Sequence, residues 1–532
     1  MSNGPIDPMA GPKYVLEGKV VTMGPQGVVP RGAIYIDAGV ITAVQESRKK
    51  PPPGFEGTPR IRTGDTIYPG LIELHNHLCY NAMPLWDVPQ KYTNNGQWKN
   101  HEDYRRLITK PSQVLGRTSG VVEALVRFVE CRCLLGGVTT SQGITLSSAP
   151  GIKTYYEGIV RNVEHTNDPL LPEAGTKIAN PSTGGAQDYI ENLKKQTCYL
   201  QHLSEGTDDT ARGWFLRLRL ENGDWALNDA FCGIHSTALT AEDFDVLAEH
   251  GASMVWSPMS NYLLYGDTID IKAVRDAGIP IGLGSDWAPS GSKNLLGELK
   301  VAWLASQELD GAFTAEELLA MVTRNPAKIL KWDSLLGTIE PRKRADLIAV
   351  NGQKGDDYMR LIDARETSIT LVIINGIPRL GQKRLMQSFG PSTEEIRVGR
   401  SRRMLNLAQE TTHPLVRDLT LTEATARLRE AMQNLPSLAQ DLDNAGRRGL
   451  LGGSADADGT TWRVVMDIEE EDSDDMALAA RPAAPYVQPM ELDDITVADD
   501  HNFLSKLSAA RNLPDFIKKL LPPLYGQELP LS

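Results

Sequence analysis

Short β-type segments flank the middle of the chain on both sides. Residues 14–66 and residues 344–381 are rich in Val, Ile and Tyr, and Gly, Pro and Asp interrupt them at short intervals. This composition is typical of short strands joined by turns. We therefore predict one composite β-sandwich domain, formed by residues 1–68 together with residues 338–395.

The middle of the chain has a different pattern, in which apolar runs end in polar residues and helical patterns follow. In one clear unit the strand-like run FCGIH ends at His235, Thr240 and Asp243 have capping-box spacing, and the run SMVWS follows the helix. Strand and helix alternate over about 270 residues, which suits a (β/α)₈ barrel of about 250 residues. We predict an α/β fold with a TIM-type barrel in residues 69–337.

From residue 396 to residue 532 we predict a C-terminal extension that is partly helical. An amphipathic helix is expected from Thr420 to Leu435, because its apolar residues recur on one face. Residues 467–475, DIEEEDSDD, carry too much like charge to be buried, so we expect a mobile acidic loop there. The apolar segment NLPDFIKKLLPPLYG is expected to pack onto the body of the protein or onto a neighbouring subunit.

The composition excludes several classes of protein. A net charge of -13 and a pI near 5.3 argue against nucleic-acid partners, since phosphate binding needs a basic face, and leave small molecules as the expected partners. The N-terminus lacks the pattern of a secretion signal, and no run approaches the about 18 apolar residues that span a membrane. The five cysteines are an odd number without regular spacing, which is typical of a reducing compartment. We therefore expect a cytoplasmic protein.

Several apolar runs in the predicted barrel end in residues that could bind a metal or move a proton. These residues are His75, His77, His202, Glu205, His235 and Asp286. Each has an ordinary alternative, since a histidine can be satisfied in a core and a glutamate can be solvated. Together they favour one shared metal site, because the strand ends of a barrel converge on one face. An unpaired buried carboxylate is also costly, and a bound cation would give Asp286 a partner.

The chain resembles the amidohydrolase superfamily in the segments PGLIELHNH, HLSE, GIHSTALTAEDFDVLAEHG, SPMSN and GLGSDWAPSGSKNLLGELK. The resemblance is to its branch of mononuclear aminohydrolases and chlorohydrolases, which includes cytosine, guanine and adenosylhomocysteine deaminases and triazine hydrolases. It covers about residues 14–385, because NPAKIL and LGTIEPRKRADLIAV also match the passage from barrel back to β-sandwich in that superfamily.

The resemblance implies a division of roles among the candidate residues. The implied metal ligands are His75, His77, His202 and Asp286. Asp286 is also implied in catalysis, as acceptor of a proton from the attacking water. Glu205 is implied as a proton donor and acceptor, and His235 as a group that orients or polarises the water.

The resemblance also implies one divalent ion per chain. Binuclear relatives bridge two metals with a carboxylated lysine or an acid, and Lys177 is the candidate here, but its surroundings do not resemble that motif. Three imidazoles and one carboxylate suit Zn²⁺, with Fe²⁺, Mn²⁺ or Co²⁺ as alternatives. Barrels of this type are often dimers or tetramers, so we expect a homo-oligomer.

The predicted reaction is hydrolysis of a carbon–nitrogen bond by a metal-activated water. Deamination of a nitrogen heterocycle is the preferred prediction. The alternative is hydrolysis of a cyclic amide or dechlorination of a heterocycle. A non-catalytic assembly protein on the same fold is a remote alternative, because such relatives usually lack the ligands that are present here.

The long segment after His77, to about residue 116, is expected to cover the substrate, because long loops in compact domains are often functional. The predicted substrate-binding residues are Asn81, Trp86, Asn261 and Trp287. The alternative, that the aromatic residues of this loop only pack it onto the barrel, stays open.

Overall fold

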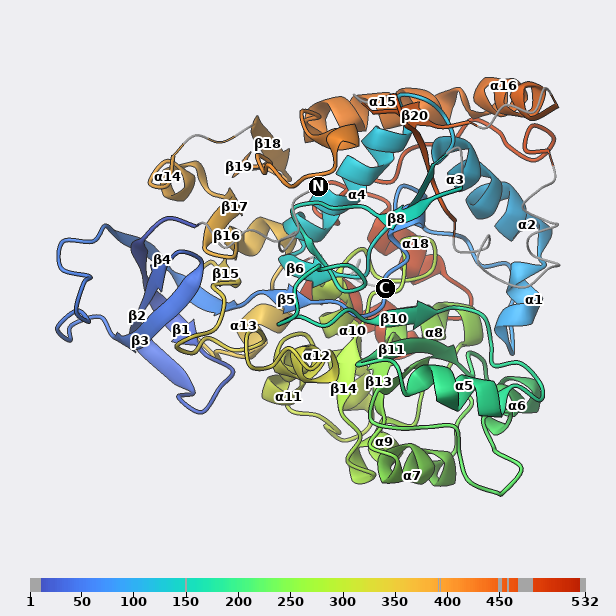
Figure 1. Cartoon of the computed structure of the whole chain (residues 1–532), viewed down its shortest axis with the longest axis horizontal. Coiled ribbons are helices and arrows are strands. Elements are labelled where there is room, and N and C mark those ends of the chain that lie inside the picture. Colours follow the sequence, from blue (N-terminus) through green and yellow to red (C-terminus); the bar gives the residue numbers. More distant parts are fainter. Residues whose placement is uncertain are drawn as a thin grey trace.

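The computed structural model describes residues 11–148, 151–390, 392, 394–447, 452–456, 459–466 and 482–526. The predicted acidic loop, residues 467–475, lies outside the described residues. Figure 1 shows a sheet at one end of the molecule, a larger body of helices and parallel strands at the other, and C-terminal helices lying on that body.

The two flanks of the chain join in one sheet of nine strands, in the order β18-β19-β17-β16-β15-β4-β1-β2-β3. The N-terminal flank contributes β1 (Tyr14–Val21), β2 (Val28–Asp37), β3 (Val40–Glu46) and β4 (Arg60–Pro69). The C-terminal flank contributes β15 (Leu347–Val350), β16 (Ile369–Ile374), β17 (Ile377–Gly381), β18 (Glu394–Val398) and β19 (Ser401–Leu405). Both flanks therefore contribute to one sheet, and this sheet continues past the predicted boundary at residue 395 to Leu405.

The junction of the flanks is the antiparallel pair of β4 and β15, where Ile67 lies opposite Ala349. Apolar side chains of both flanks, among them Val20, Ile67 and Leu347, are buried in one cluster on this sheet. Because side chains alternate between the faces of a strand, such a cluster holds the two flanks together only in this register.

Eight parallel strands form the body, in two sheets. One sheet contains β5 (Leu71–Ile72), β6 (Val138–Ser141) and β9 (Arg161–Asn162). The other contains β10 (Gly175–Lys177), β11 (Tyr199–Leu203), β12 (Phe231–His235), β13 (Ser253–Trp256) and β14 (Ile281–Leu283). An isolated parallel bridge between Asn76 and Asp286 links the end of β5 to the end of β14. The predicted parallel α/β architecture is confirmed at this level.

Helices connect the parallel strands and cover them. They are α4 (Val122–Leu135) before β6, α5 (Ala186–Leu193) before β11, α6 (Asp209–Leu216) before β12, α7 (Ala241–Glu249) before β13, and α8 (Pro258–Tyr265) with α9 (Ile271–Asp276) before β14. After β14 come α10 (Leu295–Glu308), α11 (Ala315–Ala320) and α12 (Arg324–Ile329). The long connection after β5 contains the short helices η1 (Leu78–Tyr80), α1 (Asn95–Lys99), α2 (Glu102–Tyr104) and α3 (Lys110–Leu115).

Two local predictions are confirmed in detail. At the capping box that starts α7, Asp243 Oδ2 accepts the amide of Thr240 over 3.0 Å, and Gly251 has a positive φ of 70° just after that helix. The predicted amphipathic helix is α15 (Leu421–Gln433), which Thr420 caps together with Glu423.

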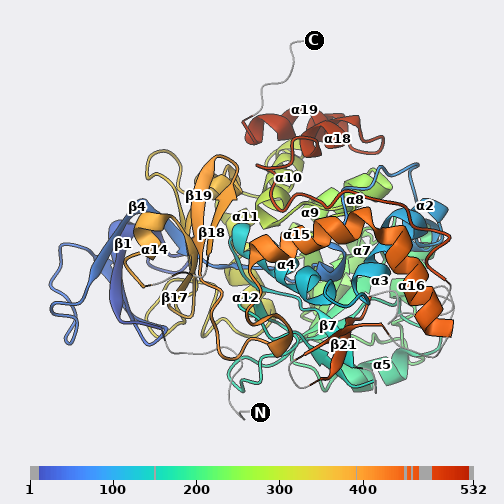
Figure 2. The same ribbon diagram turned by 90° about the horizontal axis from the view of Figure 1, so that it is seen from above.

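The described part of the C-terminal extension packs onto the body, and its last segment takes the first of its two predicted positions. α15 lies on α4, and α16 (Leu435–Arg447) lies on α3 (Figure 2). The strands β20 (Ser454–Ala455) and β21 (Thr461–Val464) add to the hairpin of β7 (Thr145–Ser148) and β8 (Lys153–Tyr155). The last helices, α18 (Phe503–Ala509) and α19 (Asp515–Leu524), pack together, and α19 lies on α10.

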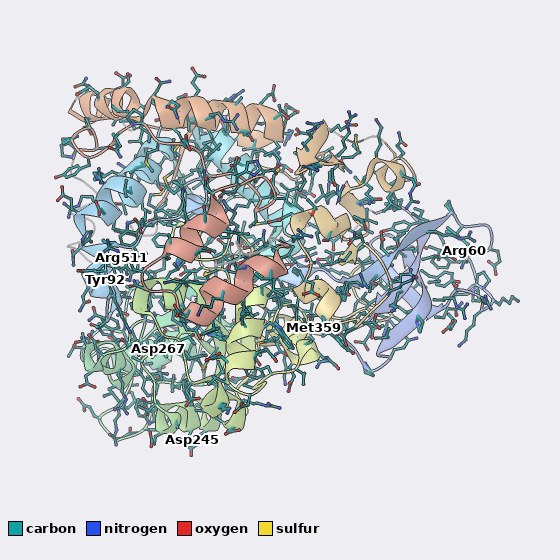
Figure 3. All side chains as sticks on the ribbon, turned by 180° about the vertical axis from the view of Figure 1, so that it is seen from behind. Arg60, Tyr92, Asp245, Asp267, Met359 and Arg511 are labelled. Carbon is teal, nitrogen blue, oxygen red and sulfur yellow. The ribbon has the colours of Figure 1, made fainter. Side chains whose placement is uncertain are left out.

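The link between α18 and α19 also contacts the loop after β5. Arg511 Nη1 donates to the carbonyl of Pro89 over 3.1 Å, and Figure 3 labels Arg511 and Tyr92 of that loop at the same edge of the molecule. No helix in the described part of the chain is both long enough and apolar enough to cross a membrane.

Candidate metal centre

The candidate residues lie at the carboxyl ends of strands, as predicted. His202 belongs to β11 and His235 is the last residue of β12, while His75, His77 and Asp286 follow β5 and β14 closely. His235 and Asp286 both have a φ of 64°, a left-handed conformation that is uncommon outside glycine. Strained backbone of this kind persists only where the surrounding structure holds it. It is often found at functional sites.

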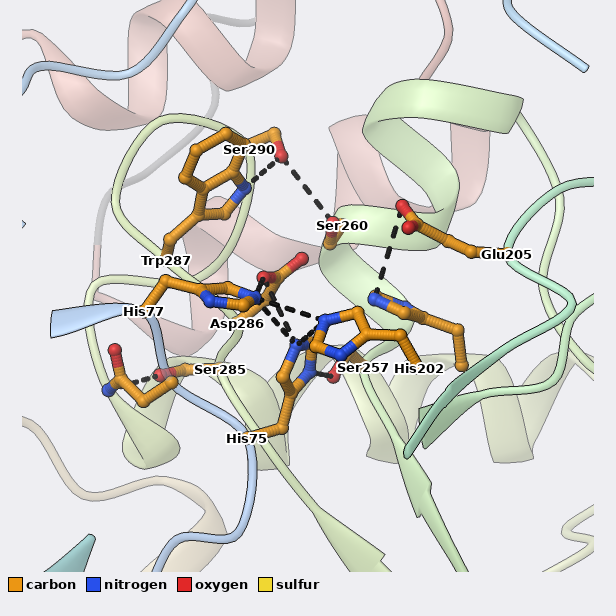
Figure 4. Close-up of polar contacts among 12 residues, drawn as sticks. His75, His77, His202, Glu205, Ser257, Ser260, Ser285, Asp286, Trp287 and Ser290 are labelled. Carbon is orange, nitrogen blue, oxygen red and sulfur yellow. Dashed lines mark hydrogen bonds and ion pairs between the residues drawn. The ribbon is translucent and has the colours of Figure 1, made fainter. Parts of the chain in front are cut away.

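Three imidazole nitrogens face one another at the centre of the site (Figure 4). The Nε2 atom of His75 lies 3.2 Å from that of His77 and 3.2 Å from that of His202, and the last two lie 3.1 Å apart. Asp286 Oδ1 lies 3.3 Å from His75 Nε2 and 3.4 Å from His77 Nε2.

This spacing fits one tetrahedral metal ion. Bonds of about 2.0–2.1 Å from zinc to nitrogen or oxygen place neighbouring ligand atoms about 3.3–3.4 Å apart. The observed separations of 3.1–3.4 Å agree with that distance. His235 lies beside the cluster, with a ring nitrogen within 4.8 Å of those of His75 and His202.

The outer nitrogens of two rings are held by buried partners. His75 Nδ1 lies 2.7 Å from Ser257 Oγ, and His235 Nδ1 lies 3.0 Å from Asn261 Oδ1. Since an amide oxygen only accepts, His235 carries its proton on Nδ1 when neutral and turns the lone pair of Nε2 toward the site. Such partners orient metal-binding and catalytic histidines.

Glu205 lies next to the cluster. Its Oε1 accepts a hydrogen bond from Tyr265 Oη over 2.7 Å, and its Oε2 accepts one from Asn95 Nδ2 over 3.1 Å. His235 Nε2 lies 4.0 Å from Glu205 Oε1. The carboxylate is therefore fixed on two sides and close enough to reach a substrate atom beside His235.

Burial sets the charge of the cluster. Burial, reinforced by the neighbouring histidines, holds the pKa of His75 and His202 well below the usual value, so both rings are neutral at pH 7. Burial raises the pKa of Asp286, and the nearby rings of His235 and His77 oppose this. A bound divalent cation would favour the ionised carboxylate and would use the neutral rings as ligands.

A cavity opens above the cluster. Its polar floor consists of His77, His202, Glu205, His235 and Asp286. Its aromatic wall consists of Tyr80, Trp98, Tyr104 and Trp287, whose rings lie edge-on or tilted against one another. Lys99 and Ile178 complete the lining. The cavity thus combines an aromatic wall with a polar reaction centre.

One of the four predicted substrate residues, Trp287, lines this cavity. Asn81, Trp86 and Asn261 do not belong to its lining. Asn81 Oδ1 accepts the amide of Ala288 over 2.7 Å, Trp86 stacks on another ring of its own loop, and Asn261 orients His235. These three side chains contact other parts of the site and not the cavity. Trp86 therefore packs its loop onto the body, whereas Tyr80 and Trp98 of the same loop line the cavity.

A second, more polar cavity lies on the other side of His77, His202 and Ile178, which line both cavities. Its other lining residues include Gln142, Thr145, Tyr155, Glu164, Thr176 and Lys177. Lys177, the candidate for a bridge between two metals, therefore lies in this neighbouring cavity and is exposed.

Several residues of the site escaped the sequence analysis. Tyr265 and Asn95 hold Glu205, and Tyr104 and Lys99 line the cavity. None of them stands at a strand end. Ser257 could have been found, because it opens the segment SPMSN that resembles the superfamily.

The fold and the cluster together define a metal-dependent hydrolase on a parallel α/β scaffold. The sequence pattern of the amidohydrolase family matches residues 215–378. The 5-methylthioadenosine/S-adenosylhomocysteine deaminase of Teredinibacter turnerae is 35% identical over 319 residues, 54% of this chain and 72% of that protein. The protein of the same name from Moorella thermoacetica is 25% identical over 398 residues, 66% of this chain and 91% of that protein. The chain belongs to the amidohydrolase family.

Two solved structures share the fold. Atrazine chlorohydrolase TrzN from Arthrobacter aurescens TC1, complexed with zinc, is 19% identical with a TM-score of 0.52, and the match covers 71% of this chain and 99% of that one. A triazine hydrolase variant is 20% identical with a TM-score of 0.52, covering 71% and 98% of the two chains. These comparisons confirm the predicted resemblance to deaminases and triazine hydrolases. They also confirm the predicted class, a hydrolase that acts on carbon–nitrogen bonds.

Proposed function

We propose that this protein is a metal-dependent aminohydrolase that removes ammonia from a nitrogen heterocycle. The observation that carries the proposal is the meeting of three imidazole nitrogens, from His75, His77 and His202, within 3.1–3.2 Å of one another beside Asp286. The complete set of ligands also argues against a non-catalytic assembly protein.

The proposed cofactor is a single divalent ion held by His75, His77, His202 and Asp286. A single tetrahedral ion accounts for the spacing of the ligand atoms, and the exposed Lys177 lies outside the cluster. Imidazole and carboxylate ligands favour Zn²⁺, while Fe²⁺, Mn²⁺ and Co²⁺ are the alternatives.

Each catalytic side chain has one task. A bound ion of this kind lowers the pKa of a coordinated water from about 15.7 to about 7. His235 accepts a hydrogen bond from the attacking water at Nε2 and so fixes its direction, and Asp286 takes the proton that the water loses. Glu205 gives its proton to the ring nitrogen next to the attacked carbon. As the carbon–nitrogen bond breaks, the proton on Asp286 passes to the departing amine, which leaves as ammonia, and the hydroxyl proton of the attacked carbon passes to Glu205, so that a carbonyl forms and both carboxyl groups return to their starting states.

The shape of the site favours a planar ring with a polar substituent. The aromatic wall suits a flat heterocycle, and the second cavity, beyond Ile178, offers polar room for a substituent. The deaminase names of the relatives support aminopurine nucleosides as the first candidate substrates. The solved chlorohydrolase keeps dechlorination of a heterocycle as the alternative, together with hydrolysis of a cyclic amide.

The test is ammonia release by the metal-loaded enzyme across adenine, adenosine, 5′-substituted adenosines, guanine, cytosine, aminotriazines and cyclic amides. Ammonia from one of the heterocycles, with close to one metal ion per chain by elemental analysis, supports the proposal. Chloride release, or ring opening without ammonia, would instead assign the alternative chemistry. Two metal ions per chain would contradict the mononuclear site.

The architecture that accompanies this function is also proposed. Strands β5, β6 and β9 to β14 close into a (β/α)₈ barrel, which the bridge between Asn76 and Asp286 supports. The domains are a composite β-sandwich of residues 1–68 and 338–395, the catalytic barrel of residues 69–337, and the extension of residues 396–532. The homo-oligomeric state and cytoplasmic location remain predictions, which light scattering and cell fractionation would test.

A further inference from the structure

The aromatic wall of the cavity is built from two loops. Tyr80 belongs to the loop after β5 and Trp287 to the loop after β14, and their rings meet perpendicularly with centroids 5.2 Å apart. Hydrogen bonds also join the two loops, since the amide of Trp86 donates to Pro289 O over 2.8 Å. The shape of the substrate slot therefore depends on how these loops are held relative to each other.

Arg132 of α4 forms hydrogen bonds with the backbone of both loops. Its Nη1 donates to the carbonyl of Asn81 over 2.8 Å, and its Nε donates to the carbonyl of Lys293 over 3.0 Å. Asn81 is the neighbour of Tyr80, and Lys293 ends the loop that carries Trp287. The side chain of Arg132 is only 2% exposed. A buried guanidinium needs a counter-charge, because an isolated buried charge is costly.

The C-terminal extension supplies that counter-charge. Asp493 Oδ2 lies 2.8 Å from Arg132 Nη1 and 2.6 Å from Lys293 Nζ, and the Asp493 side chain is 5% exposed. The amide of Asp493 donates to the carbonyl of Ala82, which follows Asn81. Asp493 is the one carboxylate paired with Arg132 among the described residues. Lys293 is paired with Asp500 as well, at 2.9 Å.

We propose that Asp493 is a positioning residue through which the C-terminal extension completes the substrate cavity. It neutralises Arg132 and Lys293 and thereby fixes the two loops that place Tyr80 and Trp287. Asp493 touches no reacting atom, so its effect is on the binding of the substrate. Asp493 lies outside residues 215–378, the part of the chain that matches the amidohydrolase family pattern, as do Arg132 and Tyr80.

The first test does not require a known substrate. In full-length Asp493→Asn, hydrogen–deuterium exchange followed by mass spectrometry should show faster uptake in residues 78–99 and 285–294. Uptake in β1 to β4 should stay unchanged. The matched control is Asp443→Asn, because Asp443 also lies in the extension and accepts the amides of Ala483 and Ala484, each over 3.0 Å, without contact to either loop. It should leave both loops unchanged.

The second test rests on the proposed function, because it needs the substrate that the ammonia screen identifies. Asp493→Asn should raise KM about tenfold and change kcat less than threefold, since one tenfold change corresponds to about 1.4 kcal/mol, the size of a charge-assisted hydrogen bond. The metal content should stay at the wild-type value. Asp493→Glu, which keeps the charge, should restore most of the wild-type KM. If the ammonia screen fails, the exchange measurement still decides the positioning role.

A purely structural ion pair would give a different result. A lower melting temperature in Asp493→Asn, with unchanged uptake in both loops and unchanged KM, would overturn the proposal. If Asp493→Asn does not fold, Lys293→Met replaces it, because this variant keeps the pair of Arg132 and Asp493. Lys293→Met should raise loop uptake and KM in the same direction by a smaller factor, and wild-type values in that variant would also overturn the proposal.

Discussion

Replacing Ser257 by Ala should weaken the metal site without removing a ligand. Ser257 Oγ lies 2.7 Å from Nδ1 of His75, whose ring is fully buried. With Nε2 directed at the other ligands, Nδ1 carries the proton and donates it to the serine oxygen. The alanine variant leaves that buried N–H without its partner and frees the ring to rotate.

The size of the effect follows from these contacts. Leaving a buried donor unsatisfied costs about 1–3 kcal/mol. Loss of a partner that orients a metal-binding histidine weakens metal affinity about 10–100-fold, which corresponds to about 1.4–2.8 kcal/mol. The two ranges agree, so we expect the zinc Kd of Ser257→Ala to rise by about one to two orders of magnitude.

Competition with a chromophoric chelator at neutral pH measures that Kd. The control is Ser253→Ala, because Ser253 begins β13, four residues before Ser257, and is also buried, but its Oγ donates to the carbonyl of Phe231 over 3.3 Å, away from the cluster. Wild-type affinity in Ser257→Ala, or an equal loss in both variants, would refute the reasoning that this hydrogen bond orients His75 as a ligand.

Three further predictions concern catalysis, packing and charge. Glu205→Gln should lower kcat at least a hundredfold and keep the metal, because proton transfer contributes about 10²–10⁴-fold; loss of metal in elemental analysis would make Glu205 a ligand instead. Gly284→Ala should weaken metal binding at least tenfold by the same chelator assay, since its Cβ would lie 2.8 Å from the backbone oxygen of His75, whereas Gly282→Ala, with no neighbour closer than 3.6 Å, should not. Burial lowers the pKa of Lys300 to about 7, so the unfolded chain keeps a proton that the folded chain releases above that pH. The unfolding free energy in urea should therefore rise from about pH 7 to about pH 10 relative to Lys300→Met, and equal pH dependence in both proteins would contradict this.

The sequence was most informative where function and strand ends coincide. His75, His77, His202 and Asp286 were predicted as one cluster, because parallel strands deliver their carboxyl ends to one edge. The structure brings their ligand atoms together.

The rest depended on long-range packing. Asn95 and Tyr265 reach Glu205 from a loop and from α8, and no local pattern marks either residue. Trp86 was expected at the substrate because it lies in a long loop, but the path of that loop turns it toward Tyr92. The nine-stranded sheet extends to β18 and β19 for the same reason: the edge of β17 accepts a further strand, which the composition near residue 395 does not reveal.

The pairing of β4 with β15 also has a consequence for biosynthesis. Ile67 and Ala349 lie opposite each other, so about 280 residues must be translated between them, which takes about 15–60 s at 5–20 residues per second. During that time the edge of β4 lacks its partner on the growing chain. Contacts of such long range slow folding and leave strand edges open to aggregation. A circularly permuted chain in which residues 338–405 precede residue 11 would complete the sheet before the body is made, and it should aggregate less during synthesis.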